Sequence, residues 1–113
     1  MGVNNMADFV IDLSKTNFDA EVLQSTTPVI VDFWASWCMP CRMMAPVVEE
    51  IAKDWKEKVK VGKLNTDDNG DIAARYGISA IPTLIIFKEG KEAVRMVGYV
   101  AKKAIETKLN NIK

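Results

Sequence analysis

A strongly apolar segment that leads into a helical segment with two cysteines is the feature that most constrains this chain. Residues 29–34 (VIVDFW) are β-branched or aromatic at positions that face both sides of a sheet, with Asp32 as the single charge. This pattern is typical of a central strand that is buried on both faces. From Cys38 to about Trp55, apolar residues recur at helical spacing, with charged residues opposite them. The two segments predict a strand followed directly by a helix, with Cys38 at the junction.

The other segments complete an alternating α/β pattern. The expected elements are a strand at 9–13, a helix at about 17–24 opened by a capping box of Thr16 and Asp19, a strand at 59–65, a short helix at 72–76, a hairpin of strands 84–87 and 92–97 that turns at Glu89 and Gly90, and a closing helix at 101–112. The order β-α-β-α-β-α-β-β-α predicts an α/β fold, with a central mixed five-stranded sheet flanked by four helices. A chain of 113 residues with 49% apolar content suits one such domain, which we place at 9–113 after an N-terminal extension at 1–8.

Cys38 and Cys41 are the only cysteines, and their spacing predicts redox chemistry. Residues i and i+3 of a helix have Cα atoms roughly 5 Å apart, which is within the range that a disulfide spans. Cys38 lies nearer to the unpaired N–H groups and the positive end of the helix dipole, which favour thiolate over thiol. We therefore expect Cys38 to be the nucleophile and Cys41 the resolving thiol. Pro40 fits the first helical turn, where a missing N–H costs nothing.

The composition excludes several other classes of function. With 15 basic and 15 acidic residues, the chain has no net field that would attract nucleic acid. It has no histidine, and two cysteines alone cannot complete a tetrahedral zinc site within one chain. Its six glycines form no phosphate-binding loop of the Walker or dinucleotide type. We therefore expect no metal, no cofactor and no nucleic-acid partner.

The distribution of apolar residues bears on location. No apolar run approaches the roughly 20 residues that a membrane-spanning helix needs. Residues 1–15 lack the basic segment and apolar stretch of a secretion signal. We therefore expect a cytoplasmic protein that is not associated with a membrane and that recognises its partners by local shape.

Asp32 and Lys63 are the charged residues that we expect to act with the cysteines. Asp32 could be a partly solvated carboxylate at a strand end, but its apolar neighbours make burial the better interpretation. A buried carboxylate has a raised pKa and can accept a proton near neutral pH, so Asp32 is a candidate to deprotonate Cys41 through a water. Lys63 shares a strand face with two valines, and it either extends its ammonium to solvent or lies near Asp32 and tunes its charge. We interpret Met43, Met44 and Met96 as packing residues.

Several segments of the chain resemble the thioredoxin family. They are Val31-Asp32-Phe33-Trp34-Ala35, Trp37-Cys38-Met39-Pro40-Cys41, Ala45-Pro46, Lys63-Leu64-Asn65, Tyr76-Gly77-Ile78, Ile81-Pro82-Thr83 and Val97-Gly98. A bare pair of cysteines two residues apart is weak support, but the pair in a βαβ context with these flanking segments in order is strong, and thioredoxin is the standard example of the motif. The resemblance covers about residues 9–112 and implies the thioredoxin fold.

The resemblance also implies a function, partners and a binding surface. It implies a disulfide reductase that acts on disulfide-containing proteins and is recharged by thioredoxin reductase, a flavin enzyme that uses NADPH. We also expect the protein to be a monomer. It implies that Pro82 is cis and faces the disulfide, with Trp37, Ile81 and Gly98 forming a shallow apolar surface for a partner's backbone. The substrate-binding residues are expected to be Trp37, Met39, Pro40, Ile81, Pro82 and Gly98. Met39 stands where the family most often has glycine, which affects the reduction potential or the choice of partner.

Two other functions remain open at this point. An oxidant or isomerase shares the fold but is expected to carry an exporting segment, and none is recognisable here. A binding subunit could use the Trp37, Ile81 and Gly98 surface while its thiols remain idle. A measured reduction potential tests the first alternative, and a variant with both cysteines replaced by serine tests the second.

Overall fold

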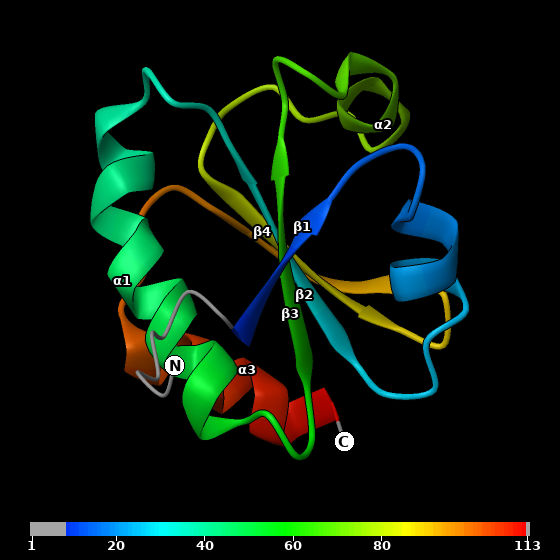
Figure 1. Cartoon of the computed structure of the whole chain (residues 1–113). Helices are drawn as coiled ribbons and strands as arrows, with labels where there is room; N and C mark the ends of the chain where they lie inside the picture. Colours follow the sequence, from blue (N-terminus) through cyan, green and yellow to red (C-terminus); the bar gives the residue numbers. More distant parts are fainter. Residues whose placement is uncertain (1–8, 113) are drawn as a thin grey trace, which may run out of the picture.

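The computed structural model describes residues 9–112, which form a layered α/β domain (Figure 1). The expected extension at residues 1–8 lies outside the described residues. The elements are, in chain order, β1 (Val10–Leu13), η2 (Asp19–Leu23), β2 (Val29–Trp34), α1 (Met39–Asp54), β3 (Lys60–Asn65), α2 (Gly70–Arg75), β4 (Thr83–Lys88), β5 (Lys91–Val97) and α3 (Lys102–Ile112). Together with the short η2, the three α-helices give the four helices that the sequence predicts.

The five strands form one mixed sheet in the order β1-β3-β2-β4-β5. Strands β1, β3 and β2 are parallel, whereas β4 is antiparallel to β2 and β5 is antiparallel to β4. Strand β2 is central, and its first five residues are all buried, as its apolar sequence predicts. The predicted thioredoxin-type α/β fold is therefore confirmed.

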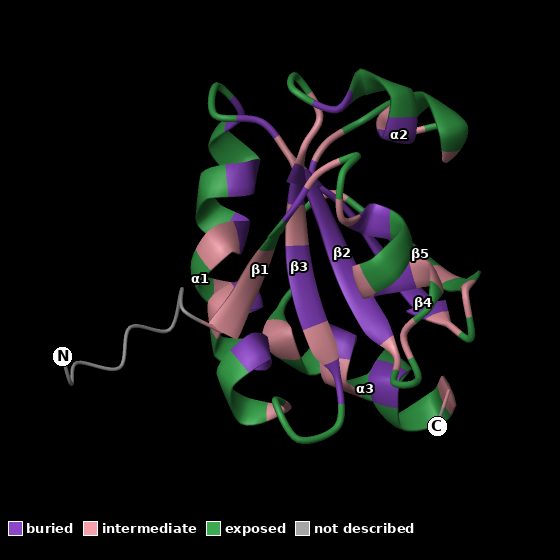
Figure 2. Cartoon of the chain, turned by 45° about the vertical axis from the view of Figure 1, so that its right-hand side comes forward, coloured by how far each residue is buried: buried purple, intermediate pink, exposed green. Residues whose placement is uncertain are grey.

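Helices cover both faces of the sheet, with α1 and α3 on one face and η2 and α2 on the other (Figure 1). The side chains between these layers form two cores. The core on the α1 side includes Ile30, Met44, Ile51, Leu84 and Ile105, and the core on the η2 side includes Phe18, Val31, Phe33, Ile85 and Phe87. Figure 2 shows the buried residues concentrated along the central strands and on the inner sides of the helices. The junction between β2 and α1, where Cys38 lies, thus follows a strand whose first five residues are buried.

The hairpin between β4 and β5 turns at Glu89 and Gly90, as predicted. Both residues have positive φ angles, 54° and 78° respectively. Two consecutive residues of this kind match the twist of antiparallel strands and form a tight two-residue turn. A Cβ atom at position 90 would also lie 2.8 Å from the backbone oxygen of Leu23. Gly90 is therefore required both by its backbone angle and by its close contact with the end of η2.

The helix predicted at 17–24 differs from the one observed, and the predicted capping box is wrong. The segment folds as a five-residue π-helix, η2, with no side-chain cap at its N-terminus. The hydroxyl of Thr16 pairs with that of Ser14 at 2.7 Å, and the side-chain oxygen of Asn17 accepts a hydrogen bond from the backbone N–H of Ser14. These local bonds form a turn ahead of the helix. They engage the hydroxyl and the backbone N–H of Thr16, which the capping box would use.

One of the three methionines predicted to pack in the core does not do so. Met44 and Met96 are buried, but Met43 is 59% exposed. Met44, Val48 and Ile51 lie on the face of α1 that contacts the sheet. A residue one position before Met44 is rotated by about 100° around the helix, which directs Met43 to the surface. No helix among residues 9–112 is both long and apolar enough to cross a membrane.

Candidate active site

Cys38 and Cys41 form a disulfide at the junction of β2 and α1. Their Cα atoms are 5.3 Å apart, as the spacing of the two residues predicts. Both side chains are largely buried, and they form a small cluster with Ala35, Trp34 and Ile81. The redox centre is therefore enclosed on its inner side by the end of β2 and by the loop before β4.

Cys38 is the N-cap residue of α1. Its backbone is extended, with φ −91° and ψ 112°, and its sulfur accepts a hydrogen bond from the backbone N–H of Cys41 at 3.2 Å. Pro40 lies in the first turn of the helix, where its missing N–H leaves no bond unmade. A sulfur at this position interacts with an unpaired N–H and the positive end of the helix dipole, both of which stabilise a thiolate.

The loop before β4 lies against the redox centre. The Ile81–Pro82 peptide bond is cis, as the family resemblance implies. The sulfur of Cys38 lies 3.7 Å from the carbonyl oxygen of Ile81. The backbone N–H of Gly98 donates a hydrogen bond to the carbonyl of Pro82 at 2.8 Å. The fold therefore brings Cys38, Ile81, Pro82 and Gly98 together, although they are distant in the sequence.

Trp37 and Met39 flank the redox centre on its outer side. Trp37 is 68% exposed and Met39 is 62% exposed. The indole N–H of Trp37 donates a hydrogen bond to a carboxylate oxygen of Asp67 at 2.9 Å, which fixes the ring against the loop after β3. A hollow of about 180 Å³ lies between Trp37 and Ile81. Sequence reasoning missed Asp67, because no local pattern shows that this loop meets residue 37.

Asp32 is buried in β2, the strand that leads to the redox centre, with 4% of its surface exposed. Burial raises its pKa from 3.8 to about 7, and the positive charge of Lys63 opposes the rise. The Oδ1 atom of Asp32 has no hydrogen-bond partner within the described part of the chain. The expectation of a buried carboxyl group with a raised pKa is therefore confirmed.

A small cavity of about 30 Å³ adjoins Asp32. It is lined by Val10, Asp32, Ala45, Val48, Glu49 and Lys63. A cavity needs only about 10 to 15 Å³ to hold a water molecule, provided that polar groups line it. Ala45 follows Cys41 by one helical turn, so the cavity lies one turn along α1 from the second thiol.

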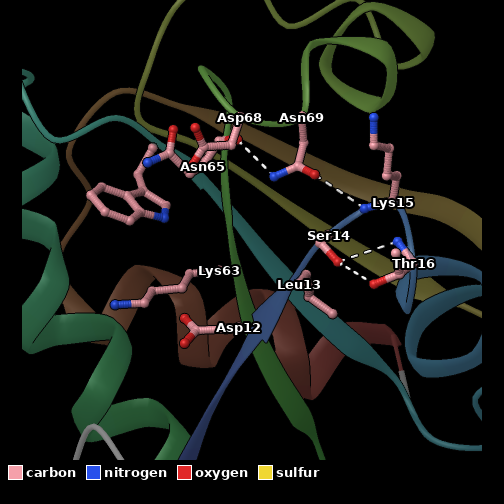
Figure 3. A pocket seen from close by; sticks show the side chains of 10 residues that line it. Asp12, Leu13, Ser14, Lys15, Thr16, Lys63, Asn65, Asp68 and Asn69 are labelled. Carbon is pink, nitrogen blue, oxygen red and sulfur yellow. Dashed lines mark hydrogen bonds between the residues drawn. The ribbon is translucent and has the colours of Figure 1, made fainter.

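Lys63 is partly buried on β3, directly opposite Asp32 on β2. Its ammonium lies 5.1 Å from the centre of the Trp34 ring, within the range of a cation–π interaction. It also lines an open pocket of about 420 Å³ at the end of β1 and β3 (Figure 3). Of the two interpretations of Lys63, the structure favours the one in which it lies near Asp32.

Comparisons with known proteins agree with this site. The thioredoxin family model matches residues 9–111. The thioredoxin of Pyropia yezoensis is 50% identical over 101 residues, covering 89% of this chain and 94% of the relative. Thioredoxin 1 of Synechococcus elongatus is 51% identical over 98 residues, covering 87% and 92%. The thioredoxin of Rickettsia bellii is 49% identical over 106 residues, covering 94% and 98%.

These matches cover 87% or more of the chain, and the family match at residues 9–111 contains Cys38 and Cys41. The disulfide between Cys38 and Cys41 stands where such a protein has its redox-active centre. The protein is therefore a thiol-disulfide oxidoreductase with protein-disulfide reductase activity, and the chain belongs to the thioredoxin family.

Proposed function

We propose that this protein reduces disulfide bonds in partner proteins, with Cys38 as the nucleophile and Cys41 as the resolving thiol. The observation that carries this assignment is the position of the Cys38 sulfur at the N-cap of α1, where it accepts the N–H of Cys41. The exposed fractions of the two cysteines are both small and do not distinguish them. The helix N-terminus does, because it stabilises negative charge on the first sulfur more than on one a turn further along.

The exchange proceeds in two steps. The Cys38 thiolate attacks one sulfur of the partner's disulfide, the partner's S–S bond breaks, and the leaving sulfur departs as a thiolate that takes up a proton. Cys41 then loses its proton and attacks the Cys38 sulfur, which releases the second partner thiolate. The partner gains two electrons and takes up two protons, of which the Cys41 thiol gives up one and solvent supplies the other, and the Cys38–Cys41 disulfide remains. Since Cys41 is held beside Cys38, the second step is unimolecular.

Asp32 accepts the proton of Cys41 in this proposal. A general base works best when its pKa is near the operating pH, and burial brings that of Asp32 to about 7. The cavity between Asp32 and Ala45 has room for the water through which the proton passes. Lys63 tunes the charge of Asp32 from the neighbouring strand.

The partner binds across the surface formed by Trp37, Ile81, Pro82 and Gly98, with Met39 and Pro40 at its edge. An apolar surface beside a recessed sulfur accepts an extended segment around the partner's disulfide. The hollow between Trp37 and Ile81 suits one side chain of that segment.

We further propose that a flavin-containing thioredoxin reductase restores the dithiol with electrons from NADPH, and that the protein works as a cytoplasmic monomer. The chain needs no cofactor of its own for this exchange, because the two thiols carry both electrons. Reconstitution with NADPH and a bacterial thioredoxin reductase tests the electron source.

Trapping of partner proteins tests the roles of the two cysteines. Cys41→Ser is expected to accumulate a mixed disulfide through Cys38 with the disulfide-containing proteins of an oxidised lysate, whereas Cys38→Ser is expected to trap almost nothing. Insulin reduction with dithiothreitol as reductant is expected to fall to the uncatalysed rate in both variants. Equal trapping by both variants would contradict the assignment of nucleophile and resolving thiol.

A further inference from the structure

Three charged residues form a row across the sheet on the face that α1 covers. Lys63 of β3 is paired in register with Asp12 of β1 on one side and with Asp32 of β2 on the other. Residues two apart on each strand, Val61 and Ile30, belong to the core on the α1 side, and side chains two apart share a face. The order across the sheet is thus carboxylate, ammonium, carboxylate.

The two carboxylates of this row have opposite environments. Asp32 is buried, whereas Asp12 is exposed on the edge strand β1. Lys63 lines both the small cavity that contains Asp32 and the open pocket that contains Asp12. Figure 3 shows the side chains of Lys63 and Asp12 on neighbouring strands at this open pocket.

The ammonium of Lys63 is not committed to either carboxylate. Within residues 9–112, no ion pair shorter than 4 Å involves Lys63, and its nearest recorded partner is the Trp34 ring. The other groups around Asp32 are Glu49 of α1, which lines the same cavity, and the apolar Leu84 of β4 and Val10 of β1. Lys63 is therefore the one cation of residues 9–112 that lines the cavity of Asp32, and its charge opposes the effect of burial on that carboxyl group.

We propose that Asp12 is a positioning residue for thiol-disulfide exchange, which shares the Lys63 ammonium with Asp32 and so limits how strongly that cation attracts the buried carboxylate. Without Asp12, Lys63 has a single carboxylate in the row as its counterion. The ionised form of Asp32 then becomes more favourable, and its pKa falls. Asp12 thus keeps Asp32 able to hold a proton near neutral pH.

This inference deepens the proposed function and rests on it, since Asp12 matters for exchange only if Asp32 accepts the proton of Cys41. The charge relation itself is independent of that role. A titration of Asp32 in the disulfide form tests the row without any catalytic step, and a rate measurement tests the proton acceptor.

The experiment is a ¹³C NMR titration of the Asp32 carboxyl group in the oxidised protein. Asp12→Asn is expected to shift the Asp32 midpoint to lower pH by on the order of half a unit, because Lys63, one strand spacing of about 5 Å from each carboxylate, then acts on Asp32 alone. Asp19→Asn is the matched control, because it removes the same charge from an exposed position on the opposite face of the sheet. It is expected to leave the Asp32 midpoint unchanged.

Repeating the titration in a protein that lacks the Lys63 charge shows whether Asp12 acts through Lys63. Lys63→Met alone is expected to raise the Asp32 midpoint, because the Lys63 charge lowers it. In the Lys63→Met protein, adding Asp12→Asn is expected to shift the Asp32 midpoint by much less than the half unit expected when Lys63 is present. An unchanged midpoint in Asp12→Asn, an equal shift in Asp19→Asn, or a full shift without Lys63 would each overturn the proposal.

The rate measurement separates this proposal from the proposed function. If both hold, the acid limb of the pH–rate profile for mixed-disulfide resolution moves with the Asp32 midpoint, and Asp12→Asn is up to about threefold faster at pH 6. A shifted midpoint with an unmoved rate profile would overturn Asp32 as the proton acceptor and, with it, Asp12 as a positioning residue, while the shared cation would stand.

Discussion

The two faces of the central sheet differ in what they bury. On the η2 side, the core contains an aromatic cluster in which Phe87 makes edge-to-face contacts with Phe18 and Tyr76, at centroid distances of 5.9 and 5.3 Å. On the α1 side, the core is aliphatic and adjoins Asp32, the one charged side chain that is buried within residues 9–112. The aromatic face contributes packing, whereas the α1 face combines packing with a desolvated carboxyl group on the strand that leads to the cysteines.

The aromatic packing and the buried carboxyl group thus lie on opposite faces of the same sheet. We expect weaker packing on the η2 side to lower stability with little effect on the redox centre, and removal of the charge on the α1 side to leave the aromatic cluster unchanged. Variants on the two faces should therefore change different quantities, and the following predictions test that separation.

The largest effect is expected from the aromatic face. Phe87→Ala removes a fully buried ring and two edge-to-face contacts, so the free energy of unfolding should fall by about 3 to 5 kcal/mol in urea titrations. The rate of insulin reduction by the remaining folded protein should stay within a factor of two. A loss of activity larger than the loss of folded protein would show that the two faces are coupled.

The opposite sign is expected at Asp32. Its pKa in the folded protein, about 7, lies above the ordinary value of 3.8, so folding favours the protonated form. The resulting destabilisation is absent below about pH 4, grows as the pH rises between 4 and 7, and is complete above 7. Asp32→Asn should therefore be more stable than wild type by about 2 to 4 kcal/mol at pH 8, since one pKa unit corresponds to about 1.4 kcal/mol.

The pH dependence of that difference provides its control. Urea unfolding at pH 8, 6 and 4 should show the advantage of Asp32→Asn shrinking steadily and vanishing near pH 4. An advantage that is independent of pH would mean that the asparagine packs better and that the charge is irrelevant.

A smaller effect is expected on the rate of exchange in the same variant. Without a base, Cys41 should attack the mixed disulfide at least tenfold more slowly near pH 7. Release of a fluorescent partner from a preformed mixed disulfide measures this step alone. The prediction fails if Asp32→Asn gains stability and resolves the mixed disulfide as fast as wild type.

The smallest effect is expected at the surface beside the cysteines. Met39 carries no charge and its thioether leaves the N–H groups of α1 unchanged, so Met39→Gly should shift the reduction potential by no more than about 30 mV. Since Met39 is 62% exposed beside Cys38, rates on different partner proteins should change more than the potential. Equilibration with glutathione measures the first quantity, and rates on several substrates measure the second. A larger shift with all rates changing in proportion would place Met39 in redox tuning.

Much of the fold and the central site was predictable, because strong local patterns determine them. The apolar run of β2 and the helical spacing after Cys38 placed the cysteines at a helix start. The face of Met43 was also available from the helical spacing, which directs position 44 inward. The predicted capping box is absent because Thr16 bonds to Ser14 through both its hydroxyl and its backbone N–H. These local partners replace the ones that the helix would offer.

The remaining features depend on contacts between distant segments. The cis form of Pro82 followed from the family resemblance alone, since no local pattern of the sequence marks it. The bond between Trp37 and Asp67 joins two loops, and the pairing of Asp12 with Lys63 depends on the register between β1 and β3. A one-residue change of register would move Asp12 to the other face, so only the three-dimensional structure shows the row of charges.

The disulfide joins residues only three positions apart, and this short span has a consequence for how the protein works as a carrier. Opening the S–S bond alters covalent structure within a single helical turn, so we expect β2 and the rest of α1 to keep their packing. The dithiol form thus holds two electrons with little change in the fold. The same rigid shape can meet an electron donor in one encounter and an electron acceptor in the next. We therefore expect its turnover to be limited by how often it meets its partners and not by any internal rearrangement.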